Sequence, residues 1–269
     1  MTCQKPYERL TRIFIDSAAS DRMADDLYLG VDWSSGSWFA VVFDSEGFDH
    51  AVVVDEIGEL WHRYEDEAQR VLIDIPIGLI EEGEEGRECD SLARTAIGPR
   101  SASIFTPPVR EATRKRRYPA AQRVNERKSG RGLSKQAFNI SDGIAAVDDL
   151  LQNVPEAATA FAESHPEVCF RALAGEPLQH SKRKAGGYAE RMRALATFDP
   201  DAPAAVQSAA EAAGDAAVAV DDVLDATVLA YAARPGPGEL RSLPADPPLD
   251  AKGLPMQIVY RASEPLVEE

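Results

Sequence analysis

The sequence of 269 residues is poor in cysteine and lacks long hydrophobic runs. Its three cysteines are scattered and form no CxxC pair, which argues against a disulfide framework and against a zinc knuckle. No apolar run approaches the ~20 residues of a membrane-spanning helix, and the polar N-terminus has no apolar core like that of a signal peptide. We therefore expect a soluble, cytoplasmic protein without a membrane partner. The phosphate-loop motifs GxxxxGKS/T and GxGxxG are also absent, which argues against the nucleotide-binding folds that carry them.

Acidic residues are abundant and lysine is rare. The 45 Asp and Glu residues oppose 29 Lys and Arg residues, for a formal net charge of −16, and only seven of the basic residues are lysine. This balance is typical of a salt-adapted cytoplasm, where salt screens self-repulsion and hydrated carboxylates keep the surface soluble. A halophilic source is our hypothesis, and it makes the overall charge a weak guide to partners.

One segment of this acidic chain is strongly basic. Residues 110–135 hold ten basic residues against Glu111 and Glu126, a local charge of +8. Two interpretations are open: a solvated helical face that pairs with nearby acids, or a contact surface for nucleic-acid phosphates.

Apolar runs separated by turn residues predict the start of a mixed sheet. Strands are expected over residues 27–31, 37–43, 50–55 and 70–75. A helix is expected before the fourth strand, because Ile57, Leu60 and Trp61 recur at helical spacing. An antiparallel meander followed by a crossover helix makes the fourth strand parallel to a meander strand. If it lies beside the first strand, both run in the same direction.

The rest of the chain is predicted to be mostly helical and to belong to one domain over residues 27–262. The other expected parts are a helical insert at about 81–155, a fifth strand at 167–173, a late helix ending at Pro235, a loop over 235–253, a last strand at 255–260, and tails at 1–26 and 263–269. The first tail is either disordered or the product of a mis-annotated start, since Met23 lies just before the first strand.

Four aspartates stand at positions where side chains can converge. Asp32 and Asp74 end central strands, while Asp222 and Asp225 lie three apart on one face of the late helix. Carboxylates held close together repel one another unless a cation neutralises them, and Mg²⁺ or Mn²⁺ suits such oxygen ligands. Two such ions can hold both the attacking and the leaving oxygen in phosphodiester cleavage. Taken singly, each aspartate is also explained as a turn or capping residue, although Asp74 and Asp225 have apolar neighbours that fit this explanation poorly.

The strings GVDW, SWFAVVFD, IDIPIGL, RECDSLARTAIGPRSASIFTPPVR, ESHPEVCFRAL and DDVLDATVLA occur in this order. In these motifs and their order, the sequence resembles the domain-of-unknown-function 429 family over roughly residues 27–262. The resemblance implies an α/β, ribonuclease-H-like fold: a mixed five-stranded sheet with flanking helices and a helical insertion. It also implies a metal-dependent nuclease acting on DNA or RNA, since the family is described as predicted nucleases.

The resemblance also assigns roles to residues. It implies that Asp32, Asp74, Asp222 and Asp225 are catalytic and hold Mg²⁺ or Mn²⁺. The stretch DDVLDA is similar to the D-x-x-D-A of Holliday-junction resolvases, which often act as dimers, so a homodimer is implied too. Two features depart from the pattern: Asp74 stands where these nucleases often have Glu, and the insert is not part of the core fold.

Further residues are candidates for contacts to the metal or the substrate. Glu167, in the E-x-H-x-E motif around His165, is expected to be a further catalytic acid near the metals. The candidate substrate-binding residues are Arg87, Arg94, Arg100, Ser101 and Lys182, because arginine and lysine suit phosphate. Simpler interpretations stay open: a salt-bridge ladder for Arg87, Asp90 and Arg94, and a turn histidine before Pro166.

Two other functions compete with a nuclease. The string GVDWSSGSW loosely resembles the first phosphate-binding hairpin of actin-like ATPases and sugar kinases, which would make the protein an ATP-dependent phosphotransferase. The other alternative is a non-catalytic nucleic-acid-binding module that keeps the fold and has lost the chemistry. In either nucleic-acid function, residues 110–135 would contact the backbone.

Overall fold

A mixed five-stranded sheet forms the centre of the computed structural model, which describes residues 26–34 and 36–268. Its strands are β1 (Leu27–Ser34), β2 (Ser37–Phe43), β3 (Phe48–Val54), β4 (Ala68–Ile73) and β5 (Phe161–Glu163). The order is β3-β2-β1-β4-β5, with β2 antiparallel to β1 and β3, and β4 parallel to β1 and β5. This is the ribonuclease-H-like arrangement that the sequence predicts, with the fourth strand parallel to the first. The predicted N-terminal tail lies almost wholly outside the described residues.

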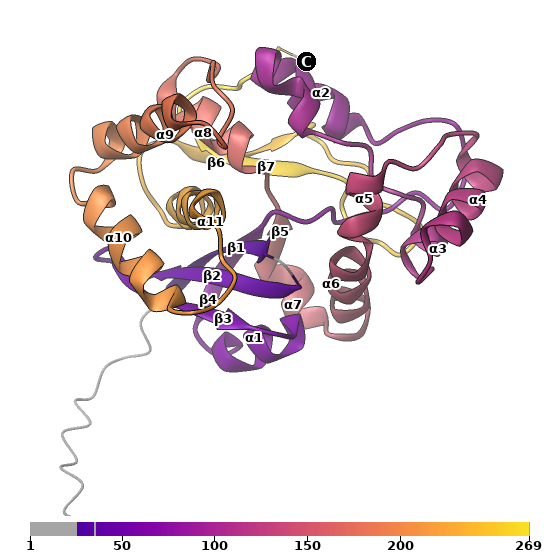
Figure 1. Cartoon of the computed structure of the whole chain (residues 1–269), viewed down its shortest axis with the longest axis horizontal. Coiled ribbons are helices and arrows are strands. Elements are labelled where there is room, and N and C mark those ends of the chain that lie inside the picture. Colours follow the sequence, from indigo (N-terminus) through magenta and orange to yellow (C-terminus); the bar gives the residue numbers. More distant parts are fainter. Residues whose placement is uncertain (1–25, 35, 269) are drawn as a thin grey trace, which may run out of the picture.

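Side-chain alternation along the strands gives the sheet two apolar faces. On β1, Leu29 and Val31 join one buried cluster together with α1 (Ile57–Tyr64), α6 (Ser141–Asn153) and α7 (Pro155–Ala160). On β2, Phe39 and Val41 join the other cluster, which is built with the helices on the opposite side of the sheet. Figure 1 shows α11 on this side with α8, α9 and α10, and α1 with α7 below the sheet. The central strands are therefore covered on both faces, as their apolar composition requires.

Helix α11 (Val220–Ala233) lies directly on β1, and a glycine allows this. A Cβ atom at Gly30 would lie 2.0 Å from the carbonyl oxygen of Ala226 and 2.2 Å from the backbone nitrogen of Ala230. Only a residue without a side chain lets helix and strand backbones approach so closely. The contact fixes the first half of α11 over the carboxyl end of β1, where Asp32 lies.

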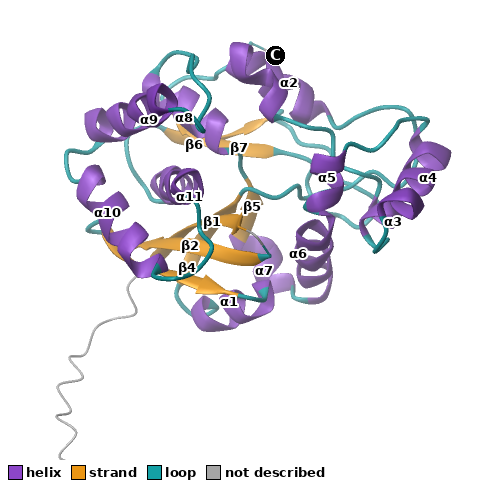
Figure 2. Ribbon diagram, viewed as in Figure 1, coloured by secondary structure: helices purple, strands orange, loops and turns teal. Residues whose placement is uncertain are grey.

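The remaining elements lie between β4 and β5 or after β5 in the chain. Between β4 and β5 lie α2 (Glu88–Ile97), the 3₁₀ helix η1 (Gly98–Ser103), α3 (Arg110–Thr113), α4 (Tyr118–Ser129), α5 (Lys135–Asn139), α6 and α7. After β5 come α8 (Pro166–Ala174), α9 (Ala185–Phe198), α10 (Ala202–Ala213) and α11, and then β6 (Glu239–Leu243) and β7 (Ile258–Ala262). Figure 2 shows the helical character of the inserted part beside the sheet. Within the residues described, no helix has the length and apolarity needed to cross a membrane.

One predicted strand is wrong, and one predicted loop contains a strand. The segment 167–173 is not the fifth strand but part of α8, because His165 caps that helix and Pro166 takes its first position. The fifth strand is instead the three-residue β5, just before it. The last strand does not join the main sheet: β7 pairs with β6 as a separate two-stranded sheet, and β6 lies within the segment predicted to be a loop.

Candidate functional site

Carboxylates stand at the ends of three adjacent parallel strands. Asp32 lies near the end of β1, and Asp74 directly follows β4, with its backbone nitrogen 2.9 Å from the carbonyl oxygen of Val31. Glu163 ends β5, opposite Ile73 of β4. Because parallel strands place their carboxyl ends at one edge, the three side chains share that edge of the sheet. Asp32 is 7% exposed and Glu163 4% exposed.

Helix α11 brings two more aspartates to this edge. Asp225 is 1% exposed and comes from the second turn of the helix. Asp222 lies in the first turn, and its Oδ2 accepts hydrogen bonds from Ser34 Oγ at 2.5 Å and from the backbone nitrogen of Ala219 at 3.0 Å. Asp222 therefore ties the start of α11 to the end of β1, a capping role that the sequence analysis also considered.

These residues line one cavity of about 540 Å³, here called the acidic cavity. Its acidic lining residues are Asp32, Asp74, Asp90, Glu163, Glu167, Asp222 and Asp225. All four aspartates predicted to be catalytic, together with Glu167, thus reach the same hollow, although they come from segments nearly 200 positions apart in the chain. Trp33, His165 and Lys182 also line it.

Burial and mutual repulsion make ionisation of this cluster unfavourable. Burial raises the pKa of Asp32 well above its ordinary value, and the charges of Asp74 and Asp225 raise it further. Burial likewise raises the pKa of Asp74, while His165 and Lys182 oppose the rise. For Asp225, burial raises the pKa to about 7 in spite of the attraction of Lys182. A group of this kind gains stability from any cation that enters it.

The cation nearest to the cluster is the protein's own Lys182. Its ammonium group donates a short hydrogen bond to Asp225 Oδ2 and lies 3.6 Å from Asp221 Oδ2. Burial alone would lower the pKa of Lys182, but Asp225, Asp32 and Asp74 together raise it, so the side chain stays charged. Lys182 was predicted to bind substrate, and the structure places it against the carboxylates themselves.

One carboxylate oxygen of Glu167 has no hydrogen-bond partner among the described residues. Its Oε1 accepts a short hydrogen bond from the fully buried Arg191, while its Oε2 is buried without any hydrogen bond. The neighbouring His165 caps α8, because its Nδ1 accepts from the backbone nitrogen of Glu167 at 3.2 Å. A buried carboxylate oxygen without a donor is costly, so Glu167 Oε2 is suited to receive an external cation or donor.

Arg87 lines the acidic cavity and is buried in an ion-pair network there. Its guanidinium group donates to Asp90 Oδ1 at 2.5 Å, to both oxygens of Glu163 at 2.7 and 2.8 Å, and to the carbonyl oxygen of Ile77 at 2.9 Å. Glu163 also accepts from the backbone nitrogen of Ile77 at 2.6 Å. With 3% of its surface exposed, Arg87 holds the loop after Asp74 in place. No local sequence pattern indicates this role of Glu163, because its partner Arg87 lies 76 positions away in the chain.

Three other candidate substrate-binding residues lie outside the lining of the acidic cavity. Arg94 donates to the carbonyl oxygen of Ile104 and to Thr106 Oγ1, both at 3.0 Å, and so braces the loop after η1. Arg100 and Ser101 belong to η1, whereas Ser103, Ile104 and Phe105 reach the cavity. The predicted ladder therefore forms only between Arg87 and Asp90, and Arg94 does not take part.

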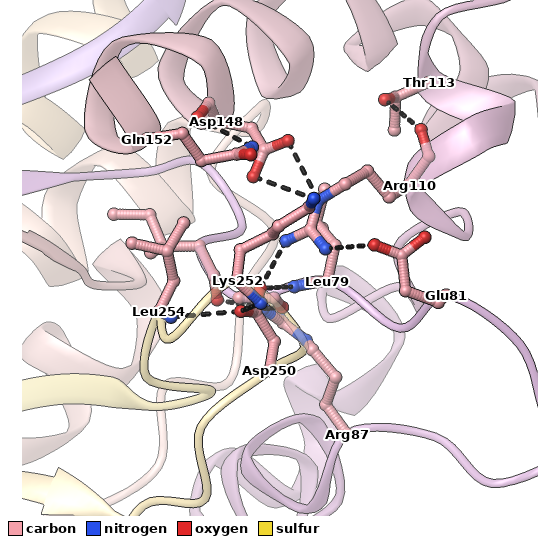
Figure 3. Close-up of polar contacts among 12 residues, drawn as sticks. Leu79, Glu81, Arg87, Arg110, Thr113, Asp148, Gln152, Asp250, Lys252 and Leu254 are labelled. Carbon is pink, nitrogen blue, oxygen red and sulfur yellow. Dashed lines mark hydrogen bonds and ion pairs between the residues drawn. The ribbon is translucent and has the colours of Figure 1, made fainter.

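Many cations of the basic segment 110–135 are already paired. Arg110 is 6% exposed and contacts Asp148 at 3.0 Å, Glu81 at 2.6 Å and Asp250, as Figure 3 shows. Further along the segment, Lys115, Arg127 and Lys128 all lie within 3.6 Å of Glu111. Among the basic residues of this segment, those that are exposed and have no side-chain partner in the described chain are Arg116, Arg117, Arg123 and Lys135. About half of the basic residues in the segment are therefore paired with acids, as the interpretation as a solvated helical face expects.

The donor set of the acidic cavity fits a hard divalent cation, but the side chains are not arranged around one. Carboxylate oxygens are the ligands that Mg²⁺ and Mn²⁺ prefer, and the raised pKa values and Glu167 Oε2 mark a shortage of positive charge. In the part of the chain that is described, no group of three or more His, Cys, Asp or Glu side chains is placed to hold a metal ion. Lys182 supplies positive charge to Asp225 and Asp32.

Comparison with protein families gives one match. The family model described as "Protein of unknown function (DUF429)" matches residues 30–249. The chain belongs to this family. The DUF429 match spans every carboxylate that lines the acidic cavity, as well as Lys182 and Arg191. Neither the comparison with curated proteins nor that with solved structures gives a significant match.

Proposed function

We propose that this DUF429 protein is a metal-dependent nuclease that hydrolyses phosphodiester bonds of DNA or RNA in the cytoplasm. The observation that carries the proposal is the convergence of Asp32, Asp74, Asp222, Asp225 and Glu167 on one cavity, where Glu167 Oε2 is buried without a partner. Cys89 and Cys169, which are buried free thiols, are compatible with a reducing compartment.

The four aspartates would hold Mg²⁺ or Mn²⁺, and Glu167 would supply a further oxygen nearby. When bound, the metal would polarise a phosphoryl oxygen and lower the pKa of a water molecule. The chain itself would orient the phosphodiester: Lys182 faces the same carboxylates and offers an ammonium group to a phosphate, and Arg87 fixes the loop that carries Asp74. The unpaired cations Arg116, Arg117, Arg123 and Lys135 are proposed to contact the nucleic-acid backbone.

A cleavage assay on single-stranded, duplex and branched DNA and RNA tests the proposal. The natural chain is expected to cleave at least one substrate with Mn²⁺ and none with EDTA. Asp74→Asn and Asp225→Asn should abolish cleavage, while the exposed control Asp246→Asn should leave it unchanged. Cleavage that persists in both cavity variants, or in EDTA, would contradict the proposal.

One observation favours a second candidate, a non-catalytic nucleic-acid-binding module. Lys182 already contacts Asp225, and among the described residues the carboxylates are not arranged for a metal. Such a module should bind nucleic acid equally well in the natural chain and in Asp225→Asn, without cleavage of any substrate. Because a salt-adapted chain can unfold as salt falls, each binding measurement needs a circular-dichroism control.

A further inference from the structure

A second hollow opens beside the acidic cavity, and we call it the side groove. Its volume is about 640 Å³, and it is lined by the loop before α9, the start of α9 and the start of α11. The side groove and the acidic cavity share four lining residues, Trp33, Lys182, Arg183 and Asp222. A chain-like ligand in the side groove would therefore reach the carboxylates.

The side groove carries positive charge that is not paired with any acid of the described residues. Arg183 and Lys184 are exposed, and neither makes a side-chain hydrogen bond or ion pair with the described residues. Two acids line the groove as well, but both have partners: Asp222 accepts from Ser34 and Ala219, and Asp221 lies 3.6 Å from Lys182. The free charge of the groove is thus cationic and suits an anion such as a phosphate.

The side groove also displays apolar surface, which is rare on the rest of the protein. Among the described residues only four large apolar side chains are exposed, and two of them, Tyr188 at 41% and Val220 at 64%, line this groove. Trp33 lies at its junction with the acidic cavity and packs against Trp38 with ring centroids 4.4 Å apart. An exposed tyrosine ring beside free cations combines a stacking surface with phosphate contacts.

We infer that the side groove binds an unpaired nucleic-acid strand, with Arg183 and Lys184 on its phosphates and Tyr188 stacked against one of its bases. A duplex hides the faces of its bases in the stack, so only an unpaired nucleotide can offer one to Tyr188. The shared chemistry is that of a single strand of DNA or RNA. The inference rests on the proposed function and specifies its substrate: a single-stranded or frayed segment that leads into the acidic cavity.

Fluorescence anisotropy in EDTA tests this inference without any need for cleavage or metal. The probes are labelled oligodeoxythymidylate, labelled oligouridylate, and a labelled DNA duplex of equal length. We expect the single strands to bind more tightly than the duplex. Tyr188→Ala should weaken single-strand binding about tenfold, the typical value of one stacked base. Tyr188→Phe should bind like the natural chain, because it keeps the ring.

The cations are tested by the salt dependence of the same binding. Arg183→Ala and Lys184→Ala should each reduce the slope of log K against log salt by about 0.7, the contribution of one single-strand phosphate contact. The matched controls are Arg193→Ala and Lys252→Ala, which remove an exposed arginine and an exposed lysine that lie outside the groove and have no side-chain partner among the described residues. These controls should leave single-strand affinity within about twofold of the natural value.

Three outcomes would overturn the inference: Tyr188→Ala that binds like the natural chain, a duplex that binds as tightly as the strands, or control variants that weaken binding as much as the groove variants. The proposed function fails separately. If single-strand binding depends on Tyr188 but the protein shows no Mn²⁺-dependent cleavage, the inference about the side groove stands and the proposed nuclease activity is wrong. If cleavage depends on Asp74 but Tyr188→Ala has no effect on binding, the nuclease proposal stands and the inference about the side groove is wrong.

Discussion

Two basic regions of this protein look alike in sequence and differ in structure. The segment 110–135 contains ten basic residues, and five of them form ion pairs with acids: Arg110, Arg114, Lys115, Arg127 and Lys128. The run Lys182–Lys184 contains only three basic residues. One of these faces the buried carboxylates of the acidic cavity, and the other two face open groove.

The difference shows that whether a cation can bind a ligand depends on its partners in the folded chain. The density of basic residues in the sequence matters less. A buried arginine surrounded by carboxylates contributes to folding, and little of its field reaches a ligand. An exposed arginine beside a hollow that leads to an acidic cavity is available to a phosphate. The smaller basic region is therefore the better candidate for recognition, and four experiments test how the two regions differ.

The largest effect is expected for Arg110→Ala. This change leaves Asp148, Asp250 and Glu81 without their shared cation, and the first two are almost fully buried. Loss of one partner of such a network costs roughly 3–5 kcal/mol of unfolding free energy. Arg183→Ala, at an exposed position without partners, should change it by less than about 0.5 kcal/mol. Urea denaturation monitored by circular dichroism gives both values, and equal effects would break the comparison.

Removal of Lys182 should strengthen metal binding. In Lys182→Met the carboxylates lose their internal cation, so Mn²⁺ should bind about tenfold more tightly in calorimetry, while the metal-free protein is less stable than the natural chain. The control Lys184→Met removes an exposed lysine two positions away and should leave Mn²⁺ affinity unchanged. Weaker Mn²⁺ binding in Lys182→Met would show that the ammonium group does not compete with the metal.

The two regions should also respond to pH with opposite sign. Burial raises the pKa of Asp225 to about 7, above its value in the unfolded chain, so the stability that its proton provides is complete below about pH 4 and lost as the pH rises to 7. Burial also disfavours ionisation of Asp250 in the Arg110 network. Hydrogen bonds from Leu79, Leu254, Lys252 and Arg110 outweigh this and lower the pKa of Asp250, so its contribution is lost as the pH falls.

Urea denaturation in EDTA from about pH 2.5 to 8 measures this contrast, because the contribution of Asp250 changes below about pH 4. The unfolding free energy of the natural chain minus that of Asp225→Asn should fall by about 3 kcal/mol between pH 4 and 7. The same difference for Asp250→Asn should rise over the acidic part of the range. Curves of the same sign for both variants would contradict the assignment of opposite environments to Asp225 and Asp250.

The smallest effect on stability is expected for Glu111→Gln. Glu111 is partly exposed and pairs with three cations, and exposed pairs of this kind contribute little to the free energy of unfolding. The change frees Lys115, Arg127 and Lys128, so nonspecific binding of duplex DNA should become stronger and more salt-dependent. Unchanged DNA binding would show that pairing is not what keeps this segment from phosphates.

Much of the acidic cavity could be predicted from the sequence, because two of its parts follow from short-range patterns. Strand and crossover order places Asp32 beside Asp74, and the spacing of Asp222 and Asp225 puts them on one helix face. The close contact of α11 with β1 depends on Gly30, which in the sequence is only one glycine in an apolar run. The fifth strand was misplaced because an apolar run after Pro166 suits a buried strand as well as a helix. Pro166 itself, at the first helical position, was the available signal.

The remaining parts depend on long-range contacts that no local pattern records. Glu163 meets Arg87 across 76 positions of the chain, and Lys182 meets Asp225 across 43. The sequence therefore shows charged residues without showing which charges cancel. This is why the role of Arg87 as a support of the loop after Asp74, and the internal pairing of residues 110–135, became visible only in the folded chain.

The measurement that tests the central claim most directly is a calorimetric titration with Mn²⁺ at high salt of the natural chain, Asp74→Asn, Asp225→Asn and the control Asp246→Asn. The account predicts saturable binding to the natural chain and to Asp246→Asn, and no binding to the two cavity variants while circular dichroism shows them folded. Absence of binding to the natural chain, or binding that is indifferent to both cavity substitutions, would contradict a shared metal site in the acidic cavity.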